Sequence, residues 1–161
     1  HRQAPEVRRA LADRCPGVRI DREAEPSGEA DRPQRAEAVL AQPLRGLVPE
    51  RWRRRLVLAD PSLVGAVELT AVDTTIEPES LRESQPSAAV GVTAAGTPIV
   101  VVCTAGVDLD VVPLAADTRA AVAADAELVI CGPARILVSV TRAVAAQLRT
   151  PARFVELDLP Y

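Results

Sequence analysis

The sequence predicts an α/β fold: a mixed sheet with a central hairpin and C-terminal βαβαβ-like crossovers, with helices packed on the sheet. Two observations support this fold class. Two runs rich in β-branched residues, 88–94 and 97–104, are separated only by a short turn, which is typical of a hairpin. Helical and strand-like patterns then alternate to the end of the chain, which favours parallel strands joined by crossovers.

Residues 1–46 are predicted to form an N-terminal helical and linker segment. A helix is expected over 4–15, where apolar side chains recur at helical spacing until Pro16. The polar stretch 25–34 contains proline and glycine and is typical of a linker. A weak helix is expected over 35–42.

Residues 47–161 are predicted to form the α/β core domain. Its first helix begins near Pro49, because the first helical turn tolerates proline. Apolar and polar residues alternate over 64–76, which predicts a half-exposed strand. The hairpin follows, and the nearly continuous apolar run of its second strand indicates that both faces of that strand are covered.

The C-terminal part of the core alternates between helix and strand. Residues 113–126 are rich in alanine and predict a helix, and 127–133 predict a buried strand. The segment 134–149 carries an apolar stripe at spacing i, i+4, formed by Ile136, Val140, Val144 and Leu148, so we expect a helix there. Residues 153–158 predict the last strand.

Composition indicates a folded protein that does not enter a membrane. Of the 161 residues, 48% are hydrophobic and 25% are charged, as in globular domains. No apolar run approaches the roughly 20 residues needed to span a bilayer. The three cysteines form no CxxC pair, and free thiols suit a reducing compartment, so we expect a soluble, cytoplasmic protein.

The basic residues exclude several chemistries. All 19 of them are arginine, and the only histidine is His1. The chain therefore lacks a lysine for a Schiff base or a P-loop, and it lacks an internal histidine for a nucleophile pair or an HExxH zinc site. The spacing of "GVTAAGTP" resembles a P-loop, but the required lysine is absent and the segment links two strands. No cofactor is expected.

The segment Arg51, Trp52, Arg53, Arg54, Arg55 is the predicted binding site. Arginine forms bidentate pairs with carboxylates and phosphates. On a helix, Arg51 and Arg55 would share a face while Trp52 turns toward apolar neighbours. A solvated helix face that pairs with local acids is the plainer interpretation. An acidic chain with pI ≈ 5.3 and 2% aromatic residues favours an acidic protein partner over a nucleic acid.

Charge is unevenly distributed along the chain. Residues 1–58 contain 13 arginines against 9 acidic residues, whereas residues 59–161 contain 6 against 13. This polarity would steer encounters with partners.

Asp108, Asp110 and Asp117 are the candidate metal ligands. The first two come at the end of a predicted buried strand, where ligands bind in open α/β sheets. Three carboxylates suit Mg²⁺ or Mn²⁺. Under this alternative, Arg119 would act as an electrophilic clamp, and Glu68 and Asp73 are further acids for the cluster. A metal-dependent nuclease would use a comparable hairpin-and-helix core, but with a lysine.

The sequence therefore predicts a non-catalytic α/β binding or assembly domain, part of a larger chain or complex, that engages an acidic partner through its arginine-rich segment. A carboxylate- and metal-dependent phosphodiester or phosphate enzyme is one alternative. A nucleic-acid-binding module that uses the same arginines is the other. The oligomeric state stays open.

Overall fold

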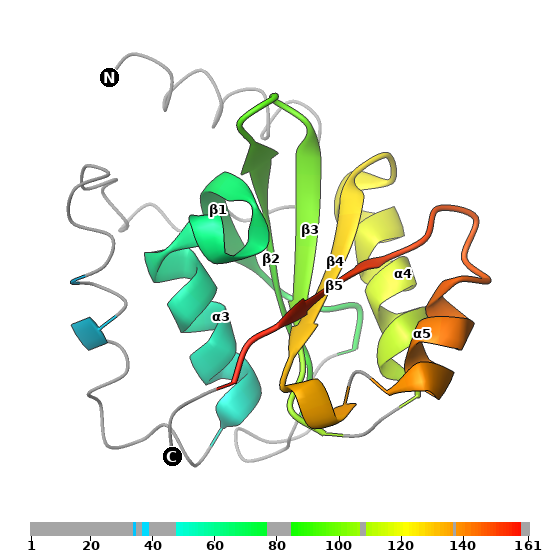
Figure 1. Cartoon of the computed structure of the whole chain (residues 1–161). Helices are drawn as coiled ribbons and strands as arrows, with labels where there is room; N and C mark the ends of the chain where they lie inside the picture. Colours follow the sequence, from blue (N-terminus) through cyan, green and yellow to red (C-terminus); the bar gives the residue numbers. More distant parts are fainter. Residues whose placement is uncertain are drawn as a thin grey trace.

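The computed structural model describes residues 34, 37–38, 48–76, 85–106, 109–136 and 138–158 (Figure 1). The predicted helix over 4–15 and the predicted linker lie outside these residues. Of the predicted helix over 35–42, only Glu37 and Ala38 are described, and both are helical, as is Gln34.

One sheet organises the described chain. Its strands are β1 (Ala66–Val72), β2 (Ser87–Thr93), β3 (Pro98–Cys103), β4 (Glu127–Gly132) and β5 (Arg153–Glu156). The helices are α3 (Pro49–Ala59), α4 (Val111–Ala123) and α5 (Ser139–Ala145), with two short 3₁₀ turns, η3 (Pro61–Val64) and η4 (Ala134–Ile136).

The five strands follow the chain in the order β1-β2-β3-β4-β5. β2 pairs antiparallel with both β1 and β3, while β4 pairs parallel with both β3 and β5. Only β2 therefore runs against the other four strands. This mixed sheet, with its hairpin and two parallel crossovers, confirms the predicted α/β fold class.

The hairpin between β2 and β3 closes through a short turn at Gly96. The Thr93 N–H donates to the Thr97 carbonyl, and the Gly96 N–H donates to the Thr93 carbonyl, each at 2.9 Å. Gly96 has a φ of 78°, a left-handed conformation that glycine adopts without steric cost. The turn links two strands and does not open a helix, as the sequence predicted.

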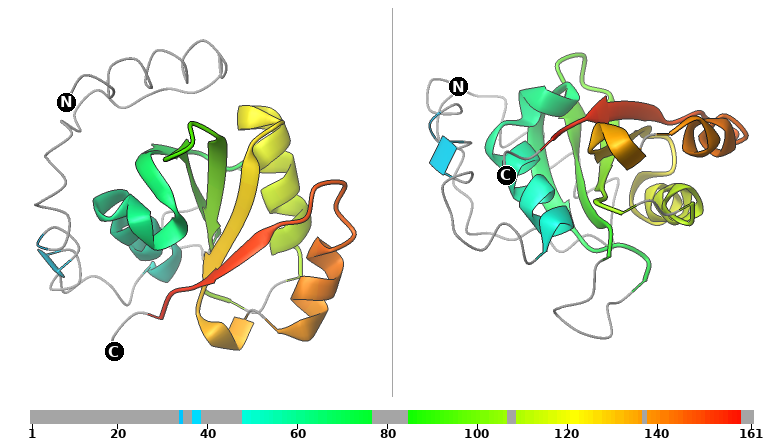
Figure 2. Two further views of the ribbon diagram at one scale, coloured as in Figure 1. Left: turned by 45° about the horizontal axis from the view of Figure 1, so that its top comes forward. Right: turned by 60° about the horizontal axis from the view of Figure 1, so that its bottom comes forward.

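Apolar side chains cover both faces of the sheet. On one face, α4 and α5 pack against a cluster that includes Val100, Val102 and Ile130. On the other face, α3 and η3 pack against Ile99 and Val101. Figure 2 shows α3 separated from α4 and α5 by the sheet. Alternate residues of β3 thus enter opposite cores, which confirms that both of its faces are covered.

The helix predicted over 134–149 is wrong in extent and in orientation. The chain forms the 3₁₀ turn η4, and α5 spans only Ser139–Ala145. Val140 and Val144 of the predicted apolar stripe are exposed, whereas Thr141 and Ala145 are buried. Ala145 joins the core beside α4, and its small side chain allows the helix to lie close to its neighbours. Packing of small residues, rather than the periodicity of the valines, therefore determines which face of α5 is buried.

The edge of the sheet that β1 forms contains an irregularity. The register of β1 against β2 shifts between Ala66 and Glu68. Gly91 lies opposite Leu69 in this ladder, and the backbone of Glu68 comes very close to it. A bulge of this kind bends an edge strand and increases its local twist.

Within the described part of the chain, no helix has the length and apolar character that crossing a membrane requires.

Candidate functional site

Helix α3 carries the arginine-rich segment, and one side of it packs onto the sheet. Pro49 occupies the first turn, as expected from its fixed φ. Trp52 and Leu56, four residues apart, are both buried, and Val57 joins the core beneath the helix. Trp52 is 3% exposed, so its side chain turns inward, away from solvent.

The arginines of this segment do not form one uniform surface. Arg53 is buried, its Nε donates to the carbonyl of Leu157 at 3.1 Å, and its Nη1 lies 3.4 Å from the carbonyl of Pro49. Burial lowers the pKa of Arg53, because a cation loses hydration there. Leu157 follows β5, so Arg53 joins α3 to the end of the chain's last strand and serves the fold.

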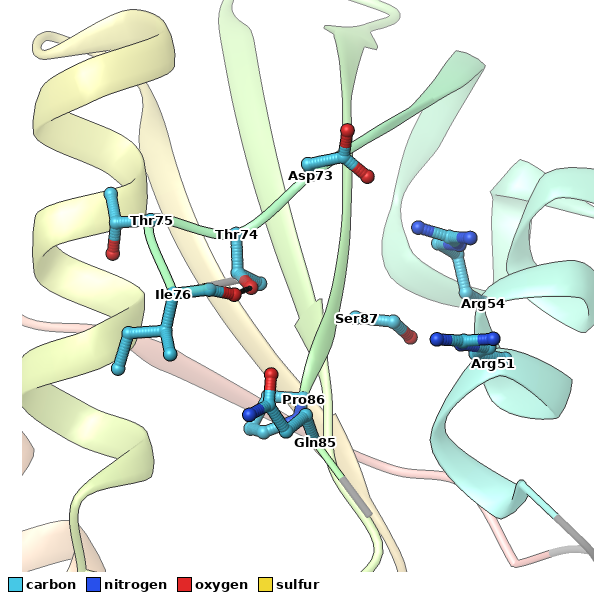
Figure 3. A pocket seen from close by; sticks show the side chains of 9 residues that line it. All are labelled: Arg51, Arg54, Asp73, Thr74, Thr75, Ile76, Gln85, Pro86 and Ser87. Atoms are coloured by element: carbon cyan, nitrogen blue, oxygen red, sulfur yellow. Dashed lines mark hydrogen bonds between the residues drawn. The ribbon is translucent and has the colours of Figure 1, made fainter. Parts of the chain in front are cut away.

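Arg51 and Arg54 line a cavity of about 500 Å³ beside α3. The remaining walls come from Asp73 to Ile76, directly after β1, and from Gln85 to Ser87, at the start of β2. Figure 3 shows the guanidinium group of Arg51 extending from α3 toward Ser87 and that of Arg54 extending toward the side of Asp73, with Ile76 and Gln85 across from α3. Arg55 is exposed and does not line this cavity.

The topology explains why these segments meet. β1 and β2 are antiparallel, so the end of β1 and the start of β2 lie at the same edge of the sheet. Ser87 is also the register partner of Cys103, the last residue of β3. The cavity therefore lies at the carboxyl edge shared by β1, β3, β4 and β5, the edge at which open α/β sheets bind ligands.

Several polar groups of the cavity already have structural partners. The Ser87 hydroxyl donates to the Glu50 carbonyl at 2.8 Å, and the Thr74 hydroxyl donates to the Ile76 carbonyl at 3.1 Å. Arg54 Nη1 donates to the carbonyl of Val72 at 3.2 Å. Arg51, in contrast, makes no hydrogen bond or ion pair to the residues that the structure describes. Within that part of the chain, its guanidinium donors are therefore not used.

The electrostatic environment of Arg54 favours an added anion. Burial lowers its pKa, and the neighbouring charges of Arg51 and Arg55 act in the same direction. Asp73 opposes this effect from the cavity wall. A carboxylate or phosphate in the cavity would stabilise the cationic form further, since nearby opposite charge offsets the loss of hydration.

The structure places the candidate metal ligands apart from this cavity. Asp110 directly precedes α4 and Asp117 lies on that helix, both exposed, while Asp108 is outside the described residues. Asp117 lies seven positions after Asp110, which corresponds to about 10 Å along the helix axis. Among the residues that can be described, no group of three or more histidine, cysteine or acidic residues is arranged to hold a metal ion.

The other proposed members of that cluster also take separate places. Arg119 is buried, and its Nη1 donates to the carbonyl of Thr150 at 3.2 Å. Glu68 lies on edge strand β1, whereas Asp73 lines the cavity. The metal site and the role of Arg119 as an electrophilic clamp stay predictions.

Cys103 and Cys131 lie side by side on β3 and β4. They are register partners in the parallel ladder, both are fully buried, and both are free thiols. A hydrogen bond to Cys131, together with burial, raises the pKa of the Cys103 thiol well above its ordinary value. Cys103 is therefore a protonated, apolar-like component of the core, as the sequence indicated.

The sequence interpretation missed most of the cavity wall. It extended the first strand to Ile76, but β1 ends at Val72, and Asp73 to Ile76 turn into the cavity. The polar run Asp73-Thr74-Thr75 was the available signal, because such residues favour strand ends and turns. Gln85 gave no comparable signal.

Comparisons with protein-family models, with curated proteins and with solved structures found no match to this chain.

Proposed function

We propose that this chain is a non-catalytic α/β binding domain that engages an acidic protein partner through the cavity lined by Arg51 and Arg54. The observation that carries the proposal is the pairing of two guanidinium groups in one cavity at the carboxyl edge of the sheet. One of them, Arg51, has donors that the described residues do not use. Charge-assisted hydrogen bonds from arginine to carboxylates are strong and directional.

The shape and charge of the site favour a protein carboxylate over a nucleic acid. An extended polyanion needs a basic surface along its whole length. Here the net charge is −3, and residues 59–161 contain 13 acidic residues against 6 arginines. Asp73 also lines the cavity itself. A single acidic side chain can enter the cavity without bringing further negative charge against these acids.

We propose that this interaction takes place in the cytoplasm. Cys103 and Cys131 are free thiols in direct contact, and a reducing compartment keeps such a pair reduced. Assembly into a larger chain or complex is the expected setting for a domain that works by docking.

Fluorescence anisotropy with a labelled peptide that carries a single glutamate, Gly-Ser-Glu-Leu-Ser-Gly, tests the proposal. The double variant Arg51→Gln/Arg54→Gln should bind about tenfold more weakly than the wild type, which corresponds to roughly 1.4 kcal/mol. Arg135→Gln/Arg149→Gln is the matched control, because both arginines are exposed, both lie outside the cavity, and the two substitutions remove the same two charges. Equal losses in the control and the double variant would refute the assignment.

A single-stranded oligonucleotide serves as the competing probe. If it binds more tightly than the single-glutamate peptide, and if its affinity falls steeply with salt, the nucleic-acid alternative is correct and the proposal is wrong.

A further inference from the structure

The cavity contains a buried hydrogen-bond acceptor with no partner. Gln85 Oε1 is inaccessible to solvent and accepts no hydrogen bond from the residues that the structure describes. Buried polar atoms of folded proteins are satisfied in the great majority of cases, by protein groups or by bound molecules. Gln85 lines the cavity and its side chain is only partly buried, so a rotation of the side-chain amide can bring Oε1 to a ligand that supplies the missing donor.

The same wall presents an apolar side chain. Ile76 is 54% exposed, and it lines the cavity together with Gln85. An isolated exposed isoleucine is common on protein surfaces. Here it lies next to an unpaired acceptor and across the cavity from Arg51 and Arg54 (Figure 3). The cavity thus offers one occupant cationic donors, a hydrogen-bond acceptor and an apolar surface.

We propose that the occupant is a peptide segment in which an acidic side chain is adjacent to an apolar one. The carboxylate pairs with Arg51 and Arg54, a backbone N–H of the segment donates to Gln85 Oε1, and the apolar side chain packs on Ile76. A volume of about 500 Å³ accommodates two to three side chains of this kind. This inference rests on the proposed function and names the recognition elements of the same site.

A peptide fits this combination better than a small anion does. Inorganic phosphate and free carboxylates carry charge but have no apolar group for Ile76. A peptide has an N–H next to every side chain, so that charge, donor and apolar group occur within two residues.

The test uses a fluorescein-labelled peptide, Gly-Ser-Glu-Leu-Ser-Gly, in anisotropy titrations with the whole chain. Replacing its leucine by serine, or methylating the backbone nitrogen of its glutamate or of its leucine, removes one recognition element at a time. We expect the leucine replacement and at least one methylation to weaken binding about fivefold. Methylating the C-terminal glycine should have no effect.

A double-mutant cycle assigns the N–H to Gln85. In the Gln85→Ala variant, the sensitive methylation should change the affinity less than twofold. In the Ile76→Ser variant, replacing the peptide's leucine should likewise have less than a twofold effect. If both effects persist undiminished in these variants, the recognition scheme is wrong.

The outcomes separate this inference from the proposed function. Suppose that the peptide's glutamate and the two arginines matter, but methylation and leucine replacement do not. The domain then binds acidic partners as proposed, and only the scheme involving Gln85 and Ile76 fails. If replacing the peptide's glutamate by glutamine changes nothing, both proposals are overturned.

Discussion

Replacing Gly91 by alanine should disrupt the edge of the sheet that forms the cavity wall. An added Cβ would overlap the carbonyl oxygen of Glu68 and would lie 2.9 Å from a methyl carbon of Leu69. Contacts under 3.0 Å essentially never occur for real Cβ atoms. The leucine methyl can rotate away, but the Glu68 carbonyl belongs to the backbone of β1, so the strand itself must move.

The expected loss in the free energy of unfolding follows from that displacement of the strand. Forcing extra volume into a packed core typically costs about 1–3 kcal/mol. We expect about 3 kcal/mol here, because backbone rather than a flexible side chain opposes the methyl group. With a urea dependence of roughly 2 kcal/mol per molar, the unfolding midpoint should fall by about 1.5 M. A shift of β1 also moves Asp73 to Ile76, so peptide binding should weaken in parallel.

Trp52 fluorescence provides the assay. It is the only tryptophan and is 3% exposed, so unfolding should shift its emission to longer wavelengths. Gly106→Ala is the matched control, because a Cβ at Gly106 would meet nothing within 4 Å. We expect that control to stay within about 0.5 kcal/mol of the wild type. A Gly91→Ala midpoint equal to that of Gly106→Ala would refute the close approach of β1.

Two further predictions concern groups that serve the fold. Arg53→Met should destabilise the protein by about 2–3 kcal/mol in urea unfolding, because Leu157 loses a charged donor. The exposed Arg55→Met should cost less than about 1 kcal/mol, and equal costs would contradict the structural role of Arg53. For Cys103, the folded-state pKa is raised, so its contribution to stability is complete below pH ~8.5 and declines as the pH rises further. Between pH 7 and pH 10, the urea midpoint should therefore fall more for the wild type than for Cys103→Ala, and identical declines would show that this thiol does not ionise on unfolding.

The sheet was predictable because its strands carry strong local signals. The apolar run in β3 and the turn at Gly96 are short-range features of the sequence. Together they predict the hairpin without information from distant parts of the chain. Alternation of helical and apolar segments then restricted the connections to parallel crossovers. The face of α5 was not predictable, because Ala145 is buried in preference to Val140 and Val144 only through contacts with distant elements.

The site was predictable only in part, for a related reason. The sequence pattern indicated the arginine-rich segment, but it could not distinguish the buried, structural Arg53 from Arg51 and Arg54, which line the cavity. That division depends on the carbonyl of Leu157, 104 residues away in the chain, which accepts from Arg53. The contact between Cys103 and Cys131 likewise requires the register of β3 against β4, which the sequence does not encode locally.

The most direct test of the central claim is an NMR titration of the arginine Nε–Hε groups with the Gly-Ser-Glu-Leu-Ser-Gly peptide. The central claim is that Arg51 and Arg54 share one cavity and bind one carboxylate there. The signals of these two arginines, assigned through their glutamine variants, should shift together and saturate at one peptide concentration. The signal of Arg149 should not move. Shifts of equal size at Arg149, or no shift at Arg51, would contradict the account.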